Sequence, residues 1–253
     1  MNAKHAVVNV KSWNNILETG TLYLLPCPIS EATDPWEVLP EANRTIMAGL
    51  DYFIVENTRT ARRFLSKAKL GLAIDTLEFR ELNEHTQAGA EVEALIEPLL
   101  AGRSAGLLSE AGVPGVADPG AWAVEACHRH GIRVVPLVGP SSILLAVMAS
   151  GLNGQSFAFN GYLPVKPPER TKAIRFFERR ARTEGQTQLF IEAPYRNAKL
   201  LEQLLQTLAP DTRLGIALHL TAPDQRIEVH PVAAWKKRKL PDTQKCPAIF
   251  LIG

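Results

Sequence analysis

The stretch best suited to chemistry is residues 109–120, which read SEAGVPGVADPG. It follows the apolar residues 106–108 and precedes a helical pattern. Glycines in such a loop let a ligand approach the backbone closely, and Glu110 and Asp118 add two carboxylates. In an open α/β sheet, ligands bind beyond the carboxyl ends of the strands. The loop therefore predicts a binding site; the alternative is a tight connection with solvated acids.

A second loop of this kind is residues 137–142, LVGPSS, between a strand-like and a helix-like segment. The free N–H groups of a helix N-terminus and the hydroxyls of Ser141 and Ser142 suit a carboxylate or a hydroxyl-bearing ligand. Alternatively, Ser141 only caps the helix. Both loops follow strands of one predicted sheet, so we expect them to share a pocket.

Two polar turns also follow predicted strands, residues 56–59 (ENTR) and residues 190–196 (FIEAPYR). Helix caps and surface cations are the alternative interpretation of both. The six histidines are dispersed without ligand spacing, so we expect no metal. Cys27 lies between Pro26 and Pro28 with no base near it in sequence, which favours a pocket-lining residue over a catalytic thiolate.

A cationic stripe is predicted on the helix at residues 168–183. Ala173, Ile174, Phe177 and Ala181 fall on the face opposite to the charges. The stripe predicts phosphate contacts with RNA, and a solvated surface helix is the alternative. Its members are Lys172, Arg175, Arg179 and Arg182.

Strand-like and helix-like segments alternate almost throughout the chain. The predicted strands are residues 21–25, 52–55, 105–108, 132–137, 157–159, 189–192, 213–218, 227–229 and 248–252. The predicted helices are residues 35–50, 58–65, 91–100, 121–130, 141–150, 168–183 and 194 to about 208. This alternation predicts an α/β fold with crossover connections. We expect two α/β domains, residues 20–139 and 140–253, after an N-terminal extension of residues 1–19.

Composition excludes several protein classes. With 46% apolar and 21% charged residues in 253, the chain is not mainly disordered. A net charge of +2 gives no sign of a nucleic-acid partner. No run of about 18 apolar residues exists, so we expect no membrane span, and the first residues show no signal-peptide pattern. Three widely spaced cysteines indicate reduced thiols in a cytoplasmic protein.

Six blocks, taken in order, resemble a known family. They are GTLYLL (20–25), ENTRT (56–60), SEAGVPGVADPG (109–120), PLVGPSS (136–142), GYLP (161–164) and IEAPYR (191–196). Together they are similar to the tetrapyrrole methylase-like superfamily of S-adenosylmethionine-dependent methyltransferases, most of all to its ribosomal RNA small subunit methyltransferase I branch. That branch methylates the ribose 2′-oxygen of a cytidine. The resemblance covers residues 20–253 and implies a two-domain α/β fold, S-adenosylmethionine in a cleft between the domains, and a homodimer.

The resemblance also implies site residues, position by position. The first-strand loop would border the cofactor through Pro26, Cys27 and Pro28. The glycine-rich loop would hold its ribose and amino-acid end through Ser109, Glu110, Gly112 and Val113. The pocket would be completed by Ser141, Ser142, Ile191, Ala217 and Ala248. As catalytic residues we expect Arg59 and Glu192 to face the methyl acceptor and Asn57 to orient it.

The chain departs from the branch at several positions. Asn57 and Glu110 stand where the branch has aspartates, and Leu218 and His219 stand where it has arginine and glutamate. We also expect the chain to lack the helical C-terminal extension common in the branch. The expected function is methyl transfer to an RNA ribose oxygen. The alternatives are methylation of a tetrapyrrole or other small molecule, and a non-catalytic homologue that binds the cofactor or RNA.

An apolar helix face could serve the implied homodimer, although core packing is the alternative use of these residues. It comprises Leu144, Leu145, Val147 and Met148.

Overall fold

The computed structural model describes residues 19–253, so the predicted N-terminal extension lies outside the described residues except for Thr19. Contacts divide the chain into two units. The first unit holds the described residues up to Leu25, with Ala42–Glu110 and Pro114–Leu137. The second unit holds Pro26–Glu41, Ala111–Val113 and Val138–Gly253. Because neither unit is continuous in sequence, the domain boundaries at residues 20–139 and 140–253 stay a prediction.

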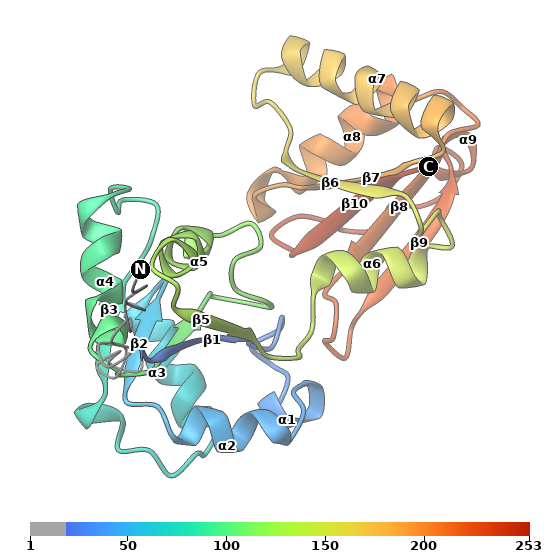
Figure 1. Cartoon of the computed structure of the whole chain (residues 1–253). Helices are drawn as coiled ribbons and strands as arrows, with labels where there is room; N and C mark the ends of the chain where they lie inside the picture. Colours follow the sequence, from blue (N-terminus) through green and yellow to red (C-terminus); the bar gives the residue numbers. More distant parts are fainter. Residues whose placement is uncertain (1–18) are drawn as a thin grey trace, which may run out of the picture. The chain divides into compact units, whose positions relative to one another are not determined.

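The first unit is built on a parallel five-stranded sheet. Its strands, in spatial order, are β3 (Glu78–Glu81), β2 (Tyr52–Val55), β4 (Ala105–Leu108), β1 (Thr21–Leu25) and β5 (Arg133–Pro136). Every residue of β2 and β4 is buried, as expected for strands covered on both faces. The helices α4 (Ala90–Leu100) and α5 (Gly120–Arg129) share one core cluster with this sheet. On the opposite side of the sheet from α5 lie α2 (Ala42–Ala48) and α3 (Thr58–Lys67) (Figure 1).

The second unit is built on a mixed five-stranded sheet. Its strands, in spatial order, are β6 (Phe157–Tyr162), β7 (Thr187–Ile191), β10 (Ala248–Ile252), β8 (Arg213–Leu218) and β9 (Arg226–Pro231). Strand β6 runs parallel to β7, whereas β10 is antiparallel to both β7 and β8. The carboxyl ends of β6, β7 and β8 and the start of β10 therefore meet at one edge of the sheet.

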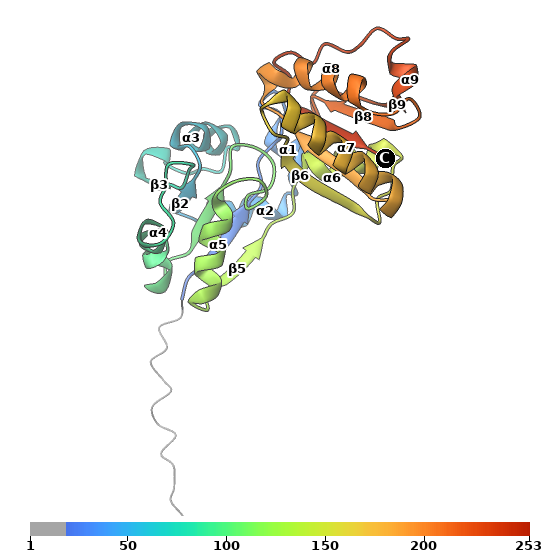
Figure 2. The same ribbon diagram turned by 90° about the horizontal axis from the view of Figure 1, so that it is seen from above.

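Helices cover both faces of this second sheet (Figure 1). One face packs against α6 (Ser142–Ser150), with Val147, Ala217 and Ile249 in a shared cluster. The other face packs against α7 (Pro167–Glu184) and α8 (Asn197–Thr207), which contact each other along the sheet (Figure 2). The short helix α9 (Val232–Trp235) follows β9. None of the described helices is long and apolar enough to cross a membrane.

The α/β class is confirmed, and the differences in its elements have physical causes. The predicted helix at residues 35–50 is wrong, because the structure breaks it into α1 (Pro35–Val38) and α2. Pro40 explains the break: proline disfavours helical backbone at the preceding residue, and Leu39 is extended with φ −105° and ψ 136°. Strand β3, with the sequence EFRE, was not predicted because it is rich in charge. The helix expected from residue 194 begins as a 3-10 turn, Pro194–Arg196, and becomes α8 at Asn197.

Candidate cofactor and substrate site

Three loops that were expected to share a pocket meet within the second unit. The N–H of Cys27 donates to the carbonyl of Gly112 at 2.8 Å, and the N–H of Gly112 donates back to Cys27 at 3.2 Å. A β-carbon added at Gly112 would lie 3.4 Å from the carbonyl oxygen of Pro140. One added at Gly139 would lie 2.2 Å from the Cβ of Pro26. We call these three backbone segments, at residues 26–28, 111–113 and 139–142, the loop cradle.

The loop cradle depends on glycine for its close packing. Gly112 has φ +73°, a left-handed conformation that side chains disfavour. At Gly139 the constraint is space, because any side chain would collide with the ring of Pro26. Both glycines therefore keep the backbones close.

The loop cradle combines a half-buried rim with a buried bridge. Pro28, Val113 and Ser142 are half-buried, so they form an accessible rim beside the buried bridge. Cys27 is buried, and burial raises the pKa of its thiol, so it lines the cradle as a neutral group. Ser141 accepts a hydrogen bond from the N–H of Leu144 at 3.4 Å and is the N-cap of α6. Ser141 therefore caps α6, as the alternative interpretation of this loop stated. The hydroxyl at the rim is that of Ser142.

The other predicted cofactor residues in the second unit lie at its sheet edge. Ile249 pairs with both Ala217 and Ile191, which places all three in the cluster beneath α6. Ala248 lies in the cluster on the opposite face, as the alternation of a strand requires. The four residues therefore lie at the same edge of the second sheet, but the side chain of Ala248 points to the opposite face from the other three. Ala217 is 1% exposed, so any contact that it makes with a ligand would come from its backbone.

The start of the glycine-rich loop belongs to the first unit. Glu110 is exposed, and its N–H donates to Oε2 of Glu56 at 3.1 Å. Burial raises the pKa of Glu56, and the nearby charges of Glu110 and Asp118 raise it further, while the hydrogen bond from Glu110 lowers it. Ser109 is half-buried beside Glu110. Glu56 was seen in the sequence only as part of a polar turn, and its position at the end of β2 was the available signal.

Asp118 organises the loop that follows. Its carboxylate accepts from the N–H of Gly115, at 3.0 and 2.9 Å to the two oxygens, and from the N–H of Gly120 at 2.8 Å. Burial raises the pKa of this carboxyl, and these backbone donors oppose the shift. Asp118 thus holds the loop conformation.

The turn at residues 56–59 is a helix start, as the capping alternative proposed. Oδ1 of Asn57 accepts from the N–H of Arg59 at 2.9 Å and of Thr60 at 3.2 Å. Glu81 of β3 accepts from the N–H of Thr58 at 3.0 Å, which lowers the pKa of Glu81. Arg59 is exposed at this helix start. Asn57 therefore fixes the backbone that carries Arg59, and the catalytic roles of both stay a prediction.

Glu192 is a buried carboxylate that holds an arginine. Its Oε1 accepts from Nη2 of Arg196 at 2.6 Å, from Nε of Arg196 at 2.9 Å and from the N–H of Ala193 at 2.8 Å. The Glu192 side chain is 0% exposed, while that of Arg196 is 27% exposed. Oε2 of Glu192 is buried with no hydrogen-bond partner among the described residues. Glu192 thus presents Arg196 to the surface, and its contact with a methyl acceptor stays a prediction.

Packing explains one of the two departures at residues 218 and 219. Leu218 is 3% exposed in the core beside α8, so an apolar side chain suits this position. His219 follows it with φ +49°, and its Nδ1 lies 3.8 Å from Asp224. The next turn is tied to the first-strand loop, because Oγ1 of Thr33 donates to the carbonyl of Thr221 at 3.0 Å.

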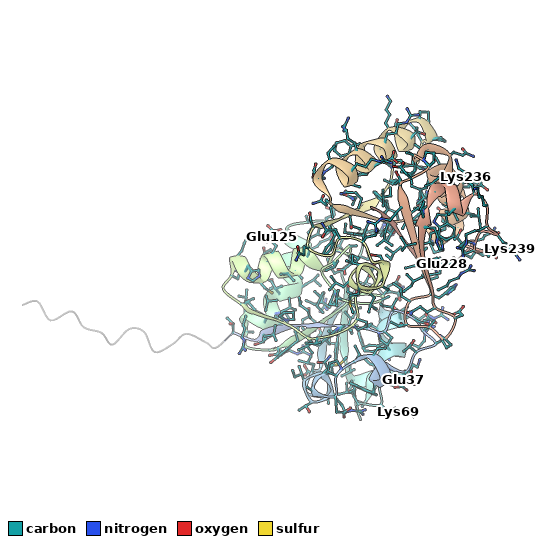
Figure 3. The ribbon with its side chains drawn as sticks, turned by 90° about the vertical axis from the view of Figure 1, so that its right-hand side faces the viewer. Glu37, Lys69, Glu125, Glu228, Lys236 and Lys239 are labelled. Atoms are coloured by element: carbon teal, nitrogen blue, oxygen red, sulfur yellow. The ribbon has the colours of Figure 1, made fainter. Side chains whose placement is uncertain are left out.

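The cationic stripe lies on α7, and the predicted opposite face is buried or half-buried. Its four cations are exposed, but they differ in their partners. Arg182 donates to Asp211 and to Thr212, which lies 2.8 Å away. The guanidinium of Arg179 lies 5.6 Å from the ring centroid of Phe176. Another basic cluster contains Lys236 and Lys239, which lie on the same side of the second unit as Glu228 (Figure 3).

No group of three or more His, Cys, Asp or Glu side chains that could hold a metal gathers within residues 19–253. The cysteines in this range are free thiols: Cys27 and Cys127 are buried and Cys246 is half-buried.

Comparison with known proteins gives consistent results. The sequence profile described as "Tetrapyrrole (Corrin/Porphyrin) Methylases" matches residues 37–235. The ribosomal RNA small subunit methyltransferase I of Mesorhizobium japonicum is 36% identical over 233 residues, covering 92% of this chain and 74% of that protein. The protein of the same name from Vibrio cholerae is 32% identical over 212 residues, covering 84% of this chain and 69% of that protein.

Solved structures share the fold. The methyltransferase CobJ matches with a TM-score of 0.59 at 16% identity, covering 93% of this chain and 94% of that one. A uroporphyrin-III C-methyltransferase from Thermus thermophilus, complexed with S-adenosylhomocysteine, matches with a TM-score of 0.53 at 19% identity, covering 92% and 97%. Since the profile spans most of the chain and the curated relatives align along most of their length, the chain belongs to the tetrapyrrole (corrin/porphyrin) methylase family and is an S-adenosylmethionine-dependent methyltransferase.

Proposed function

We propose that the protein transfers a methyl group from S-adenosylmethionine to a ribose oxygen of small-subunit ribosomal RNA. The observation that carries the proposal is the 36% identity over 92% of the chain to a protein named for methylating that RNA. A ribosomal substrate would also place the enzyme in the cytoplasm.

When bound, S-adenosylmethionine supplies an electrophilic methyl group on sulfur. The loop cradle would hold it. We also assign to the cofactor Ser109 and Glu110, which directly precede the segment at residues 111–113. Methyl transfer to a hydroxyl needs the acceptor oxygen in line with the methyl group, and the hydroxyl proton must leave. We assign Arg59 to the acceptor, where a cation stabilises developing negative charge on oxygen. Asn57 orients Arg59 through the helix cap, and Glu192 acts through Arg196.

The stripe on α7 suits the phosphates of an RNA acceptor. Lys172, Arg175 and Arg179 make no ion pair among the described residues, whereas Arg182 is held by Asp211. We therefore assign phosphate contacts mainly to the first three cations, with Arg182 as a weaker contributor.

We also propose a homodimer that uses the exposed face of α6. Leu144 is 51% exposed and Met148 is 77% exposed, one helical turn apart. Val147 is buried in the core and Leu145 packs partly against it, so these two residues serve packing instead.

The test is methylation with tritiated S-adenosylmethionine, using small ribosomal subunits purified from a strain that lacks the gene. Radioactive ribosomal RNA, with the label mapped to a ribose oxygen, is the expected result. Uroporphyrinogen III is offered in parallel, and labelling of that tetrapyrrole in place of RNA would overturn the assignment of the acceptor.

A matched pair of variants tests the cofactor site. Glu110→Ala removes an exposed carboxylate assigned to the cofactor, and Glu125→Ala removes an exposed carboxylate on α5 that pairs with Arg129. Calorimetric titration with S-adenosylmethionine is expected to show weaker binding for Glu110→Ala alone. Equal affinity in both variants would remove Glu110 from the site.

A further inference from the structure

Two tyrosines and an arginine gather at the sheet edge of the second unit. Tyr162 ends β6 and is 62% exposed, and Tyr195 follows β7 and is 68% exposed. The guanidinium of Arg196 lies 5.3 Å from the ring centroid of Tyr195. Tyr162 pairs in register with Ile191, the last residue of β7, so all three side chains start from the same sheet edge. We call these three side chains the aromatic platform.

The surrounding structure holds Tyr162 in place from both sides along the chain. The pairing of β6 with β7 shifts register between Phe159 and Tyr162, and Gly161 there has φ +60°. The amide of Asn160 fills this irregularity by donating to Oε1 of Gln188 at 3.1 Å. Such a bulge redirects the next side chain.

The turn after Tyr162 is fixed by a buried cation. Nε of Arg170 donates to the carbonyl of Pro164 at 2.8 Å, and its Nη2 donates to the carbonyl of Val165 at 2.6 Å. Arg170 is 6% exposed although it lies near the start of α7. The buried side chain of Arg170 therefore fixes the loop that follows the exposed ring of Tyr162.

Arg196 is also fixed in place, by hydrogen bonds to Glu192. Its partner Glu192 is fully buried and uses one oxygen for both guanidinium bonds, at 2.6 and 2.9 Å. A buried ion pair is weak evidence for stability, because desolvation offsets the attraction. A geometric role, keeping the guanidinium beside the Tyr195 ring, accounts for it better.

Exposed aromatic rings beside a fixed guanidinium are the surface on which unpaired nucleobases stack. An apolar protein partner would gain nothing from the guanidinium of Arg196. In a nucleic-acid duplex the base faces are already stacked on one another and are not accessible. From this chemistry we propose that the aromatic platform stacks an unpaired base of the RNA acceptor, and that Glu192 is a positioning residue for Arg196. This inference rests on the proposed function. Tyr162 pairs in register with Ile191, a proposed cofactor residue, so the stacked base would lie next to the methyl donor.

The test compares ring removal with ring retention. Tyr162→Ala and Tyr195→Ala lose the stacking surface, Tyr195→Phe keeps it, and Trp122→Ala removes a partly exposed ring from α5 as a control. Two assays are run on each variant: methylation of small ribosomal subunits, and anisotropy with a fluorescent single-stranded oligocytidine. Calorimetry with S-adenosylmethionine checks that the cofactor site is intact.

Tyr162→Ala and Tyr195→Ala are each expected to raise KM for the subunits and Kd for the oligonucleotide by about 5-fold to 150-fold, the range for one stacked base. Trp122→Ala is expected to match the wild type, and Tyr195→Phe, which keeps the ring, is expected to raise KM and Kd less than Tyr195→Ala does. Cofactor affinity is expected to stay unchanged in all four. Glu192→Gln keeps the shape and loses the charge, so it is expected to raise KM with little change in kcat.

The two proposals fail differently. If the wild type methylates the subunits and both Tyr162→Ala and Tyr195→Ala keep its KM and Kd, the aromatic platform is wrong and the proposed function stands. If the wild type labels no RNA yet the alanine variants alone lose oligonucleotide binding, the proposed function is wrong and the platform stands. Equal damage from Tyr195→Phe, or dissociation of a dimer by the alanine variants, would also overturn the stacking role.

Discussion

The packing of the loop cradle requires glycine at position 139, where only a hydrogen atom fits in place of a side chain. The α-carbon of Gly139 lies against the ring of Pro26, and this contact joins the first-strand loop to the start of α6. The strand argument predicted a shared pocket for the loops at residues 109–120 and 137–142, and the family resemblance added the first-strand loop. The sequence could not show that the glycine is required by contact with a proline more than 100 residues away.

Replacing Gly139 by alanine is expected to destabilise the fold by about 2–3 kcal/mol, since the new β-carbon would lie 2.2 Å from Pro26. Cofactor affinity is expected to fall with it. Thermal unfolding and calorimetry measure both. The matched control is Gly154→Ala, where the new β-carbon would make an ordinary 3.6 Å contact with Val147. Equal melting temperatures for the two variants would contradict the close-packing argument.

Glu56 gives a pH-dependent prediction at the same scale. Burial raises its pKa in the folded state, so folding carries a penalty wherever the carboxyl is ionised. Below the unfolded-state pKa both states are protonated and the penalty vanishes; it grows as pH rises through the folded-state pKa and then stays constant. Glu56→Gln, which still offers an acceptor to Glu110, is therefore expected to unfold at higher urea than the wild type at about pH 7.5, with no difference at about pH 3. A stabilisation that persists in acid would exclude the titration of Glu56 as its cause.

At the scale of elements, much of the architecture could be predicted because apolar periodicity is a local property. The strands at Thr21–Leu25, Tyr52–Val55 and Ala105–Leu108 have the bounds that the sequence indicated. The failures have local causes as well: Pro40 breaks a helix, and the charges of β3 hide a strand. The aromatic platform was not predicted, because exposure depends on which strands become neighbours. The ion pair of Glu192 with Arg196 was not predicted either, because Glu192 precedes the 3-10 turn and a spacing of four brings side chains together only within a helix.

The start of α3 provides a prediction about one element. Asn57→Ala removes the acceptor for two N–H groups and is expected to lower stability by about 1 kcal/mol. Asn57→Asp keeps this acceptor and is expected to stay within about 0.5 kcal/mol of the wild type. Urea unfolding measures both. If Asp proves as damaging as Ala, the amide serves something other than the cap.

For the whole molecule, net charge is a poor guide to the partner. The chain carries only +2, yet α7 presents exposed cations along one face. Binding to RNA through such a face depends on the phosphates that it neutralises, and the salt dependence of binding counts them.

Lys172→Ala combined with Arg175→Ala is therefore expected to reduce the slope of log Kd against log salt by about 1.4–1.8. The control is Arg180→Ala on the same helix, because Arg180 is already paired with Glu184. Its slope is expected to match the wild type. Filter binding of small-subunit RNA over a range of salt gives the three slopes, and an unchanged slope in the double variant would remove α7 from the RNA contact surface.

The place of β10 in the second sheet has a consequence for biosynthesis. It is the middle strand, between β7 and β8, although it is the last of the five to be translated. Until it leaves the ribosome, β7 and β8 have no shared neighbour, and the sheet edge with Ile191, Ala217 and Ala248 cannot form. A growing chain would therefore acquire this part of its proposed cofactor site only after all five strands of the sheet have been translated. Proteolytic trimming into β10 would leave two separate pairs of strands, β6–β7 and β8–β9, in place of one sheet.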